Sequence, residues 1–429
     1  MTYHNAIKYI KNSPNITPKD SSAKERIEML FLALGNPHKK IKYIRLAGNN
    51  GKSVCAQMMT YILNESGILS GSLTMPLLSE LRENIKIGGQ MISMDETVRF
   101  TEQVIKAVAE INASNEQAND SAHKVFAPTA HEIMLCIALL AFDEHKCSLA
   151  FIESDHSTED PSRFLPVPIS AVICGAIPCE DTEEISKIQS YIQRGVNDVI
   201  SVPQDAAAFQ TIQSTCHAAN CRLTISVPKK ASVTALNLGG TKFNYKNNAY
   251  ALRICGRFQV TNAILAIETC NVLTRNGYKI TQSHIESGLY KTALPSKFEI
   301  LSVSPTIIVD STYAPIAIET VCASFEELKP FIGNKVRLCL PFGEICEQYA
   351  NELISRGFDI ENIFALSLSD DDDPCELDSL QIPINIFNTP KQIAKKVLAS
   401  LDKDTILLVS GKTNISEKIR YEILSILGF

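Results

Sequence analysis

The fold is decided by the stretch Ile44-Arg-Leu-Ala-Gly48-Asn49-Asn50-Gly51-Lys52-Ser53. Tyr43–Leu46 is predicted to form a short strand, and the amphipathic pattern of Val54–Ser66 predicts a helix directly after the loop. Glycines between a strand and a helix let backbone N–H groups turn inward around an anion, and the helix N-terminus adds partial positive charge. The stretch therefore predicts a phosphate-binding loop, in which Lys52 faces the terminal phosphates and Ser53 offers a hydroxyl to Mg²⁺.

Outward from this loop, short β-branched runs alternate with helical patterns, which is typical of parallel sheets flanked by helices. Further strands are expected at Leu69–Thr74, Ser148–Ile152, Ala171–Cys174 and Asp198–Val202, and again at Thr306–Val309, Val336–Leu340, Ile363–Leu366 and Ile406–Val409. Lys246-Asn247-Asn248 reads as the turn of a β-hairpin, and a long helix is expected over Val260–Asn276. The predicted fold class is α/β: a P-loop domain over residues 1–295, with a mostly parallel sheet and a small hairpin region, and then a smaller Rossmann-like doubly wound domain over residues 296–429.

Length and composition narrow the possible classes of protein. A chain of 429 residues is long enough for two or three domains at about 150 residues each. The apolar fraction of 45% and the charged fraction of 21% are ordinary for a globular chain and exclude a disordered or fibrous protein. A net charge of -6 gives no support to a nucleic-acid or anionic-membrane surface, so neither partner is expected.

The apolar segments and the cysteines indicate the compartment. The longest apolar stretch, Met134–Phe142, is far shorter than the ~20 residues that span a bilayer, and the N-terminus lacks the apolar core of a signal peptide. Thirteen cysteines include no Cys-x-x-Cys pair, which favours reduced thiols in the core. A cytoplasmic protein is expected.

Six motifs in chain order resemble those of folylpolyglutamate synthases, which belong to the Mur ligase superfamily. The glycine-rich loop, preceded by Leu34-Gly-Asn-Pro37, resembles that family's G-T-N-G-K-G-S loop. The other five are Thr74-Met-Pro with Arg82-Glu-Asn and Ile87-Gly-Gly-Gln, Pro128-Thr-Ala-His-Glu132, Gly256-Arg-Phe-Gln-Val-Thr-Asn262-Ala, Pro295-Ser-Lys-Phe-Glu299, and Asp310-Ser-Thr-Tyr-Ala-Pro315. The resemblance covers almost the whole chain and implies the two-domain fold of that superfamily.

The resemblance also implies a reaction. Members of the family use ATP to phosphorylate a carboxylate, and the amine of an amino acid then displaces phosphate to form an amide. The expected activity is that of an ATP-dependent ligase that adds an amino acid, glutamate, to a carboxylate acceptor such as a folate. ATP and Mg²⁺ are the implied cofactors, the partners are small-molecule substrates, and a monomer is expected.

Individual site residues follow from the matched motifs. Glu153, at the end of a predicted strand, coincides with the magnesium-binding glutamate of the family, and with Lys52 it is an expected catalytic residue. Ser53, Glu153 and Glu180 are the expected metal ligands. The expected nucleotide-binding residues are Gly48, Asn49, Asn50, Gly51, Lys52, Ser53, Gln259, Asn262, Lys297 and Asp310, of which Gln259 and Asn262 match positions that contact adenine and Lys297 replaces a phosphate-binding arginine.

Several positions depart from the family pattern and leave two alternatives open. Glu180 stands where the family has a metal-binding histidine, and Gln189 where it has a lysine that becomes carbamylated. Ser154-Asp-His-Ser-Thr158 replaces a glycine-rich turn, and Tyr313-Ala314 replaces a polar pair. One alternative is a relative that binds nucleotide but has lost ligation and has a regulatory or interaction role. The other is a ligase with a different acceptor.

Overall fold

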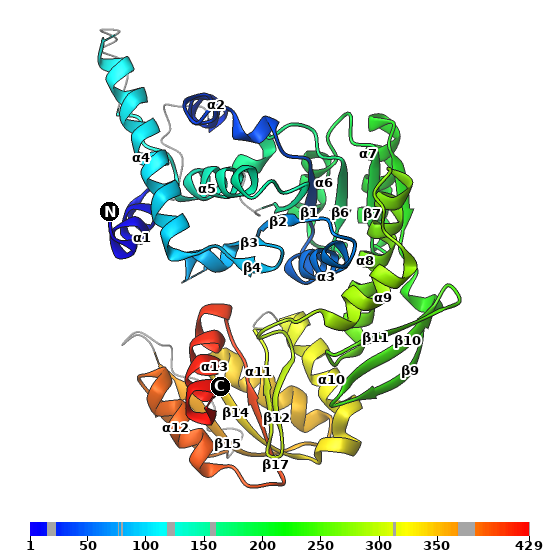
Figure 1. Cartoon of the computed structure of the whole chain (residues 1–429). Coiled ribbons are helices and arrows are strands. Elements are labelled where there is room, and N and C mark those ends of the chain that lie inside the picture. Colours follow the sequence, from blue (N-terminus) through cyan, green and yellow to red (C-terminus); the bar gives the residue numbers. More distant parts are fainter. Residues whose placement is uncertain are drawn as a thin grey trace. The chain divides into compact units, whose positions relative to one another are not determined.

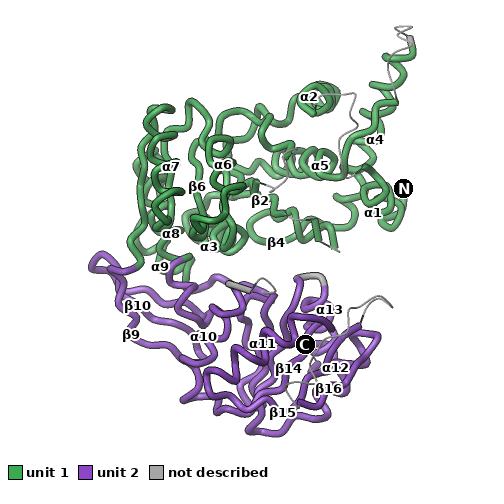
Figure 2. The backbone as a smooth tube through the Cα atoms, turned by 180° about the vertical axis from the view of Figure 1, so that it is seen from behind, with its two compact units in different colours: residues 1–228, 262–289 green, residues 229–261, 290–429 purple. Residues whose placement is uncertain are grey.

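The computed structural model describes residues 1–14, 23–75, 77–78, 80–117, 125–154, 160–311, 315–367 and 382–428. Contacts divide the chain into two compact units, coloured separately in Figure 2: unit 1 comprises Met1–Pro228 and Asn262–Leu289, and unit 2 comprises Lys229–Thr261 and Tyr290–Phe429. The hairpin region thus groups with the C-terminal part of the chain. The domain boundary expected between residues 295 and 296 stays a prediction.

Unit 1 is built on an eight-stranded sheet in the order β4-β3-β2-β5-β1-β6-β7-β8 (Figure 1). Its strands are β1 (Tyr43–Ala47), β2 (Ser70–Leu73), β3 (Ile85–Ile87), β4 (Gln90–Met91), β5 (Leu149–Glu153), β6 (Ser170–Ile173), β7 (Asp198–Ser201) and β8 (Arg222–Ile225). The pairs from β2 through β8 are parallel, whereas β3 and β4 are antiparallel additions at one edge. Parallel pairing brings the carboxyl ends of β1, β5 and β6 to one edge of the sheet.

Helices pack on both faces of this sheet, some of them directly and others through another helix. They are α1 (Tyr3–Asn12), α2 (Ala23–Ala33), α3 (Lys52–Glu65), α4 (Met94–Gln117), α5 (Ala130–Glu144), α6 (Thr182–Tyr191), α7 (Ala206–Ala219), α8 (Arg257–Arg275) and α9 (Gln282–Lys291). Successive residues of β2 contact opposite layers: the Ser70 hydroxyl donates to Thr60 of α3, whereas the Cα of Gly71 faces the Phe142 ring of α5. Such alternation is what a pleated strand imposes.

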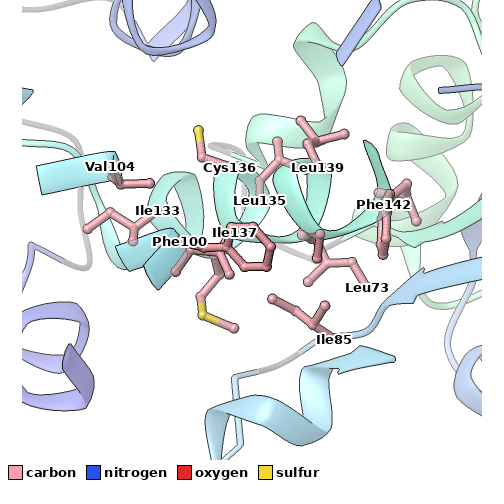
Figure 3. Close-up of a cluster of buried hydrophobic side chains, with 14 of the residues drawn as sticks. Leu73, Ile85, Phe100, Val104, Ile133, Leu135, Cys136, Ile137, Leu139 and Phe142 are labelled. Atoms are coloured by element: carbon pink, nitrogen blue, oxygen red, sulfur yellow. The ribbon is translucent and has the colours of Figure 1, made fainter. Parts of the chain in front are cut away.

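The largest apolar core of unit 1 surrounds α5. Figure 3 shows Ile133, Ile137 and Phe142 of this helix beside Phe100 of α4 and Leu73 of β2. Because α5 carries buried apolar residues on every side, it lies between the sheet and α4 instead of at the surface.

Unit 2 contains two sheets. The three-stranded antiparallel sheet has the order β11-β10-β9, and the mostly parallel six-stranded sheet has the order β12-β13-β17-β14-β15-β16. The strands are β9 (Ser232–Asn237), β10 (Gly240–Tyr245), β11 (Asn248–Leu252), β12 (Glu299–Val303), β13 (Thr306–Val309), β14 (Lys335–Pro341), β15 (Asp359–Leu366), β16 (Ile384–Phe387) and β17 (Thr405–Val409). The helices are α10 (Pro315–Ile332), α11 (Glu344–Ser355), α12 (Pro390–Ser400) and α13 (Thr413–Leu427). Unit 2 therefore combines a hairpin-based sheet with a doubly wound one.

The expected α/β fold class is confirmed, and the expected strands and helices are found at or within a few residues of the predicted bounds. The β-hairpin turns at Lys246-Asn247, whose φ angles of +48° and +66° are those of a type I′ turn. The described cysteines are free and most of them are buried, as expected. Within the described ranges, no helix is both long and apolar enough to cross a membrane.

Candidate active site

The loop Gly48–Gly51, here called the phosphate loop, joins the end of β1 to the first turn of α3. Gly48 and Gly51 have φ angles of +95° and +82°, a backbone region that favours glycine. Gly51 is the N-cap of α3, and its carbonyl accepts the Cys55 N–H at 2.8 Å. The N–H groups of the first helical turn consequently point toward the loop, which is the arrangement that binds phosphate oxygens.

A buried ion pair lies beside this loop. Lys52 Nζ is 3.5 Å from Glu153 Oε1, and the two side chains are 7% and 5% exposed. The pair forms because Glu153 ends β5 opposite Leu46 of β1, the strand that leads into the loop. Ser53, next in the helix, is exposed. Lys52, Glu153 and Ser53, which the sequence assigns to one site, thus lie at the same edge of the sheet.

Asn262 of α8 also lies against the phosphate loop. A methyl group on the Gly51 Cα would be 2.6 Å from Asn262 Oδ1, and the Cys55 thiol lies 3.7 Å from the Asn262 carbonyl oxygen. A hydrogen bond with Cys55 and burial raise the pKa of the Cys174 thiol, so this group beneath the loop stays neutral. A neutral thiol adds no repulsion toward a bound phosphate.

The expected metal ligand Glu180 lies in the turn between β6 and α6 and is exposed. Gln189 lies on the exposed side of α6, where Lys187 pairs with Glu183 at 2.6 Å. A role for Glu180 in metal binding stays a prediction. The departures at Asp155–Thr158, Tyr313 and Ala314 lie outside the described residues.

The hard oxygen donors of the site fit a magnesium ion. The Ser53 hydroxyl is exposed at the start of α3, and the Glu153 carboxylate already faces the positive end of a buried lysine. Magnesium is bound in proteins through one or two carboxylates together with substrate phosphates. That Ser53 and Glu153 hold this ion stays a prediction.

Three expected nucleotide-binding residues lie in unit 2. Lys297 is flanked by Ser296 and Phe298, whose φ angles of +55° and +58° are unusual for residues other than glycine. Asp310, at the end of β13, accepts the Phe298 N–H at 2.8 Å and so holds the loop that carries Lys297. Gln259 is buried in the first turn of α8.

Phe298 links these elements through edge-to-face contacts with two neighbouring rings. Its ring centroid is 6.1 Å from that of Phe258, the neighbour of Gln259, and 5.6 Å from that of Phe325. Phe298 of this motif therefore helps to hold the loop that carries Lys297, and phosphate binding by Lys297 stays a prediction.

Another motif of the resemblance has a structural role in the described residues. Thr129 and Glu132 form a capping box at the start of α5, since the Glu132 N–H donates to Thr129 Oγ1 and the Thr129 N–H donates to Glu132. Glu132 also accepts Arg26 Nε at 3.0 Å, and both side chains are buried. This motif therefore also ties α2 to the start of α5.

Sequence reasoning missed Asp181, the N-cap of α6, whose carboxylate accepts a hydrogen bond from Asn49 of the phosphate loop at 3.0 Å. The only local sign was an aspartate three residues before Glu184, which is a capping pattern and says nothing of the loop.

No family model matches the chain. The sequence is 25% identical over 345 residues to the folylpolyglutamate synthase of Lacticaseibacillus casei, covering 76% of this chain and 77% of that protein. It is 25% identical over 358 residues to the dihydrofolate synthase/folylpolyglutamate synthase of Bacillus subtilis, covering 77% of each.

Solved structures share the fold. The folylpolyglutamate synthase of Thermotoga maritima has a TM-score of 0.80 at 21% identity, covering 99% of this chain and 97% of that one. A folylpolyglutamate synthase complex with AMPPCP and folate has a TM-score of 0.77 at 19% identity, covering 100% of both chains.

Fold and site together define a two-unit α/β protein with a glycine-rich phosphate loop between β1 and α3. Within that class, the chain is similar to folylpolyglutamate synthases, in sequence over about three quarters of its length and in fold over nearly all of it.

Proposed function

We propose that the chain is an ATP-dependent ligase that joins glutamate to a folate-type carboxylate acceptor. The observation that carries the proposal is the buried Lys52–Glu153 pair, at 3.5 Å, beside a helix N-terminus that follows two glycines of positive φ. The named activities of the relatives supply the acceptor and the amino acid. ATP and Mg²⁺ are the proposed cofactors.

The reaction requires two group transfers. The γ-phosphoryl group of ATP passes to an oxygen of the acceptor carboxylate, which gives ADP and an acyl phosphate. The amine of glutamate attacks the acyl carbon, the C–O bond to phosphate breaks, and the amine loses a proton. Both steps gather anions, so the protein contributes mainly positioning and positive charge.

The described residues divide this work. The phosphate loop offers backbone N–H groups to the phosphates, and Lys52 turns its ammonium group from Glu153 toward the terminal phosphate as the nucleotide binds. Mg²⁺, when bound, neutralises phosphate charge, and Ser53 and Glu153 would hold it. Glu180 is proposed as a further ligand. Gln259, Asn262, Lys297 and Asp310 are proposed to contact the nucleotide.

A second candidate function is nucleotide binding without ligation. It is favoured by the exposure of Gln189 and Glu180, which stand where the family has a lysine and a metal-binding histidine. A ligase with another acceptor is the third candidate. All three share the phosphate loop and differ in the product that is formed.

The test is amide formation with ATP, Mg²⁺, glutamate and dihydrofolate or tetrahydrofolate, measured as ADP release and by mass spectrometry of the product. Loss of the phosphate-facing charge in Lys52→Ala should lower the rate by about 10²–10³-fold. Lys106→Ala is the matched control, since Lys106 lies on α4 with its side chain 79% exposed, and it should leave the rate unchanged. ADP binding without product from any folate supports the second function, and product from another carboxylate supports the third.

A further inference from the structure

We propose that Asp181 is a positioning residue of the phosphate loop, which it holds through Asn49. The inference rests on the proposed function only in taking the loop to bind nucleotide phosphates. Asp181 ends the segment of residues 174–181, here called the β6–α6 segment, which joins the carboxyl end of β6 to α6.

The β6–α6 segment holds three successive residues of the phosphate loop. A methyl group on the Gly48 Cα would lie 2.1 Å from the carbonyl oxygen of Cys174, so these backbones are in direct contact. A methyl group on Gly175 would lie 2.9 Å from the N and O atoms of Asn50. Between them, Asn49 Nδ2 donates to Asp181 Oδ2 at 3.0 Å. The two backbone contacts fix how closely the phosphate loop approaches the β6–α6 segment. The hydrogen bond fixes the orientation of the Asn49 side chain.

The carboxylate of Asp181 is itself oriented. Its Oδ1 accepts the Glu184 N–H at 3.0 Å, which caps α6, while Oδ2 accepts from Asn49. Glu184 is buried and accepts the Tyr191 hydroxyl at 3.0 Å, so the first turn of α6 is tied to its last. Because Oδ1 is hydrogen-bonded to the first turn of α6, Oδ2 is held facing the phosphate loop.

Gln204, which follows β7, braces the same segment. Its Nε2 donates to the Gly175 carbonyl at 3.0 Å, and its Oε1 accepts the Ile177 N–H at 2.8 Å. The β6–α6 segment is thereby fixed to the residue that follows β7 as well as to the phosphate loop. A fixed support lets one hydrogen bond restrict the loop before the nucleotide arrives, which lowers the ordering cost of binding.

Two substitutions isolate this contact. Asp181→Ser retains a hydroxyl that caps α6 but is too short to reach Asn49, and Asn49→Ala removes the other end without touching α6. Calorimetric titration with MgADP should show about tenfold weaker binding in each, since hydrogen bonds to charged groups are of that strength. The double variant should be no weaker than either single variant, because all three lack the same contact.

Two controls separate positioning from stability. Asp205→Ser makes the same replacement at the N-cap of α7, where the side chain makes no cap hydrogen bond, and should bind MgADP as the wild type does. The thermal midpoint of Asp181→Ser should match the wild type because the cap persists. Asp181→Asn keeps a neutral hydrogen bond after the Asn49 amide turns over, and should recover affinity to within about threefold.

Wild-type affinity in Asp181→Ser, or losses that add in the double variant, would overturn the inference. If Asp181→Ser fails to fold, Asn49→Ala and Asp181→Asn still test the inference. Equal losses of MgADP affinity in these two variants would contradict it, because Asp181→Asn is expected to keep a hydrogen bond to Asn49. A wild-type protein that binds MgADP but makes no amide leaves the inference standing and removes the ligase proposal. A wild-type protein that binds no nucleotide removes both.

Discussion

Gly48→Ala tests whether the phosphate loop depends on close contact with β6. Gly48 has a φ of +95°, and the added methyl group would lie 2.1 Å from the carbonyl oxygen of Cys174. That carbonyl cannot easily retreat, because the N–H of the same residue donates to the Ala47 carbonyl at 2.8 Å. The loop has to move instead.

Two effects determine how far Gly48→Ala should lower MgADP affinity and turnover. A residue other than glycine in the left-handed region costs roughly 1–2 kcal/mol, which is about 5–30-fold in affinity at 1.4 kcal/mol per tenfold. The contact is also about 1 Å shorter than the ordinary C···O approach of roughly 3.3 Å, so the loop shifts by about that distance. A shift of about 1 Å at reacting groups costs about 10²-fold in rate. We expect MgADP affinity to fall by roughly 30-fold and turnover by roughly 10²-fold.

Gly67→Ala is the matched control, since Gly67 also has a positive φ, +74°, but has no atom within 4 Å of the added methyl group. It should lower the free energy of unfolding by about 1–2 kcal/mol and leave MgADP affinity unchanged. Calorimetry and urea unfolding of both variants measure the two quantities. If Gly48→Ala bound MgADP within threefold of the wild type, the contact with Cys174 would not shape the loop.

Three further substitutions have distinct expected outcomes. Glu132→Gln should lower the free energy of unfolding by about 3–5 kcal/mol in urea, because it leaves the buried charge of Arg26 without its carboxylate; a loss below 1 kcal/mol would contradict this. Burial alone would raise the pKa of Glu96, but hydrogen bonds from Ser93 and His145 lower it to about 2. The ionised Glu96 carboxylate therefore stabilises the folded state fully above its ordinary pKa of 4.5, and this stabilisation is lost as the pH falls toward 2. The difference in melting temperature between the wild type and Glu96→Gln should accordingly disappear between pH 4.5 and pH 2. A difference that stays constant over this range would refute the assignment. Lys297→Ala should weaken MgADP binding about tenfold without changing the unfolding midpoint, since the half-buried lysine lies on a loop held by Asp310 through Phe298; a changed midpoint would indicate a structural role instead.

Much of the α/β architecture could be predicted from the sequence because it depends on local patterns. β13 occupies the predicted residues Thr306–Val309, and α8 starts only three residues before the predicted Val260. The strands that escaped prediction, such as β12 and β16, lie at the edges of their sheet and have half-exposed residues. Their apolar pattern is weak, and they are strands because each pairs with one neighbouring strand, β12 with β13 and β16 with β15.

The candidate site divides in the same way. Sequence alone determined the strand, the two glycines, Lys52 and the carboxylate at the end of β5, since each is a local pattern around a strand end or helix start. Only the tertiary structure decided that Asn49 meets Asp181, which lies 132 residues away, and that Asn262 faces Gly51. The physical reason is that parallel pairing aligns the carboxyl ends of strands widely separated in the chain, so residues with no shared local pattern become neighbours at one edge.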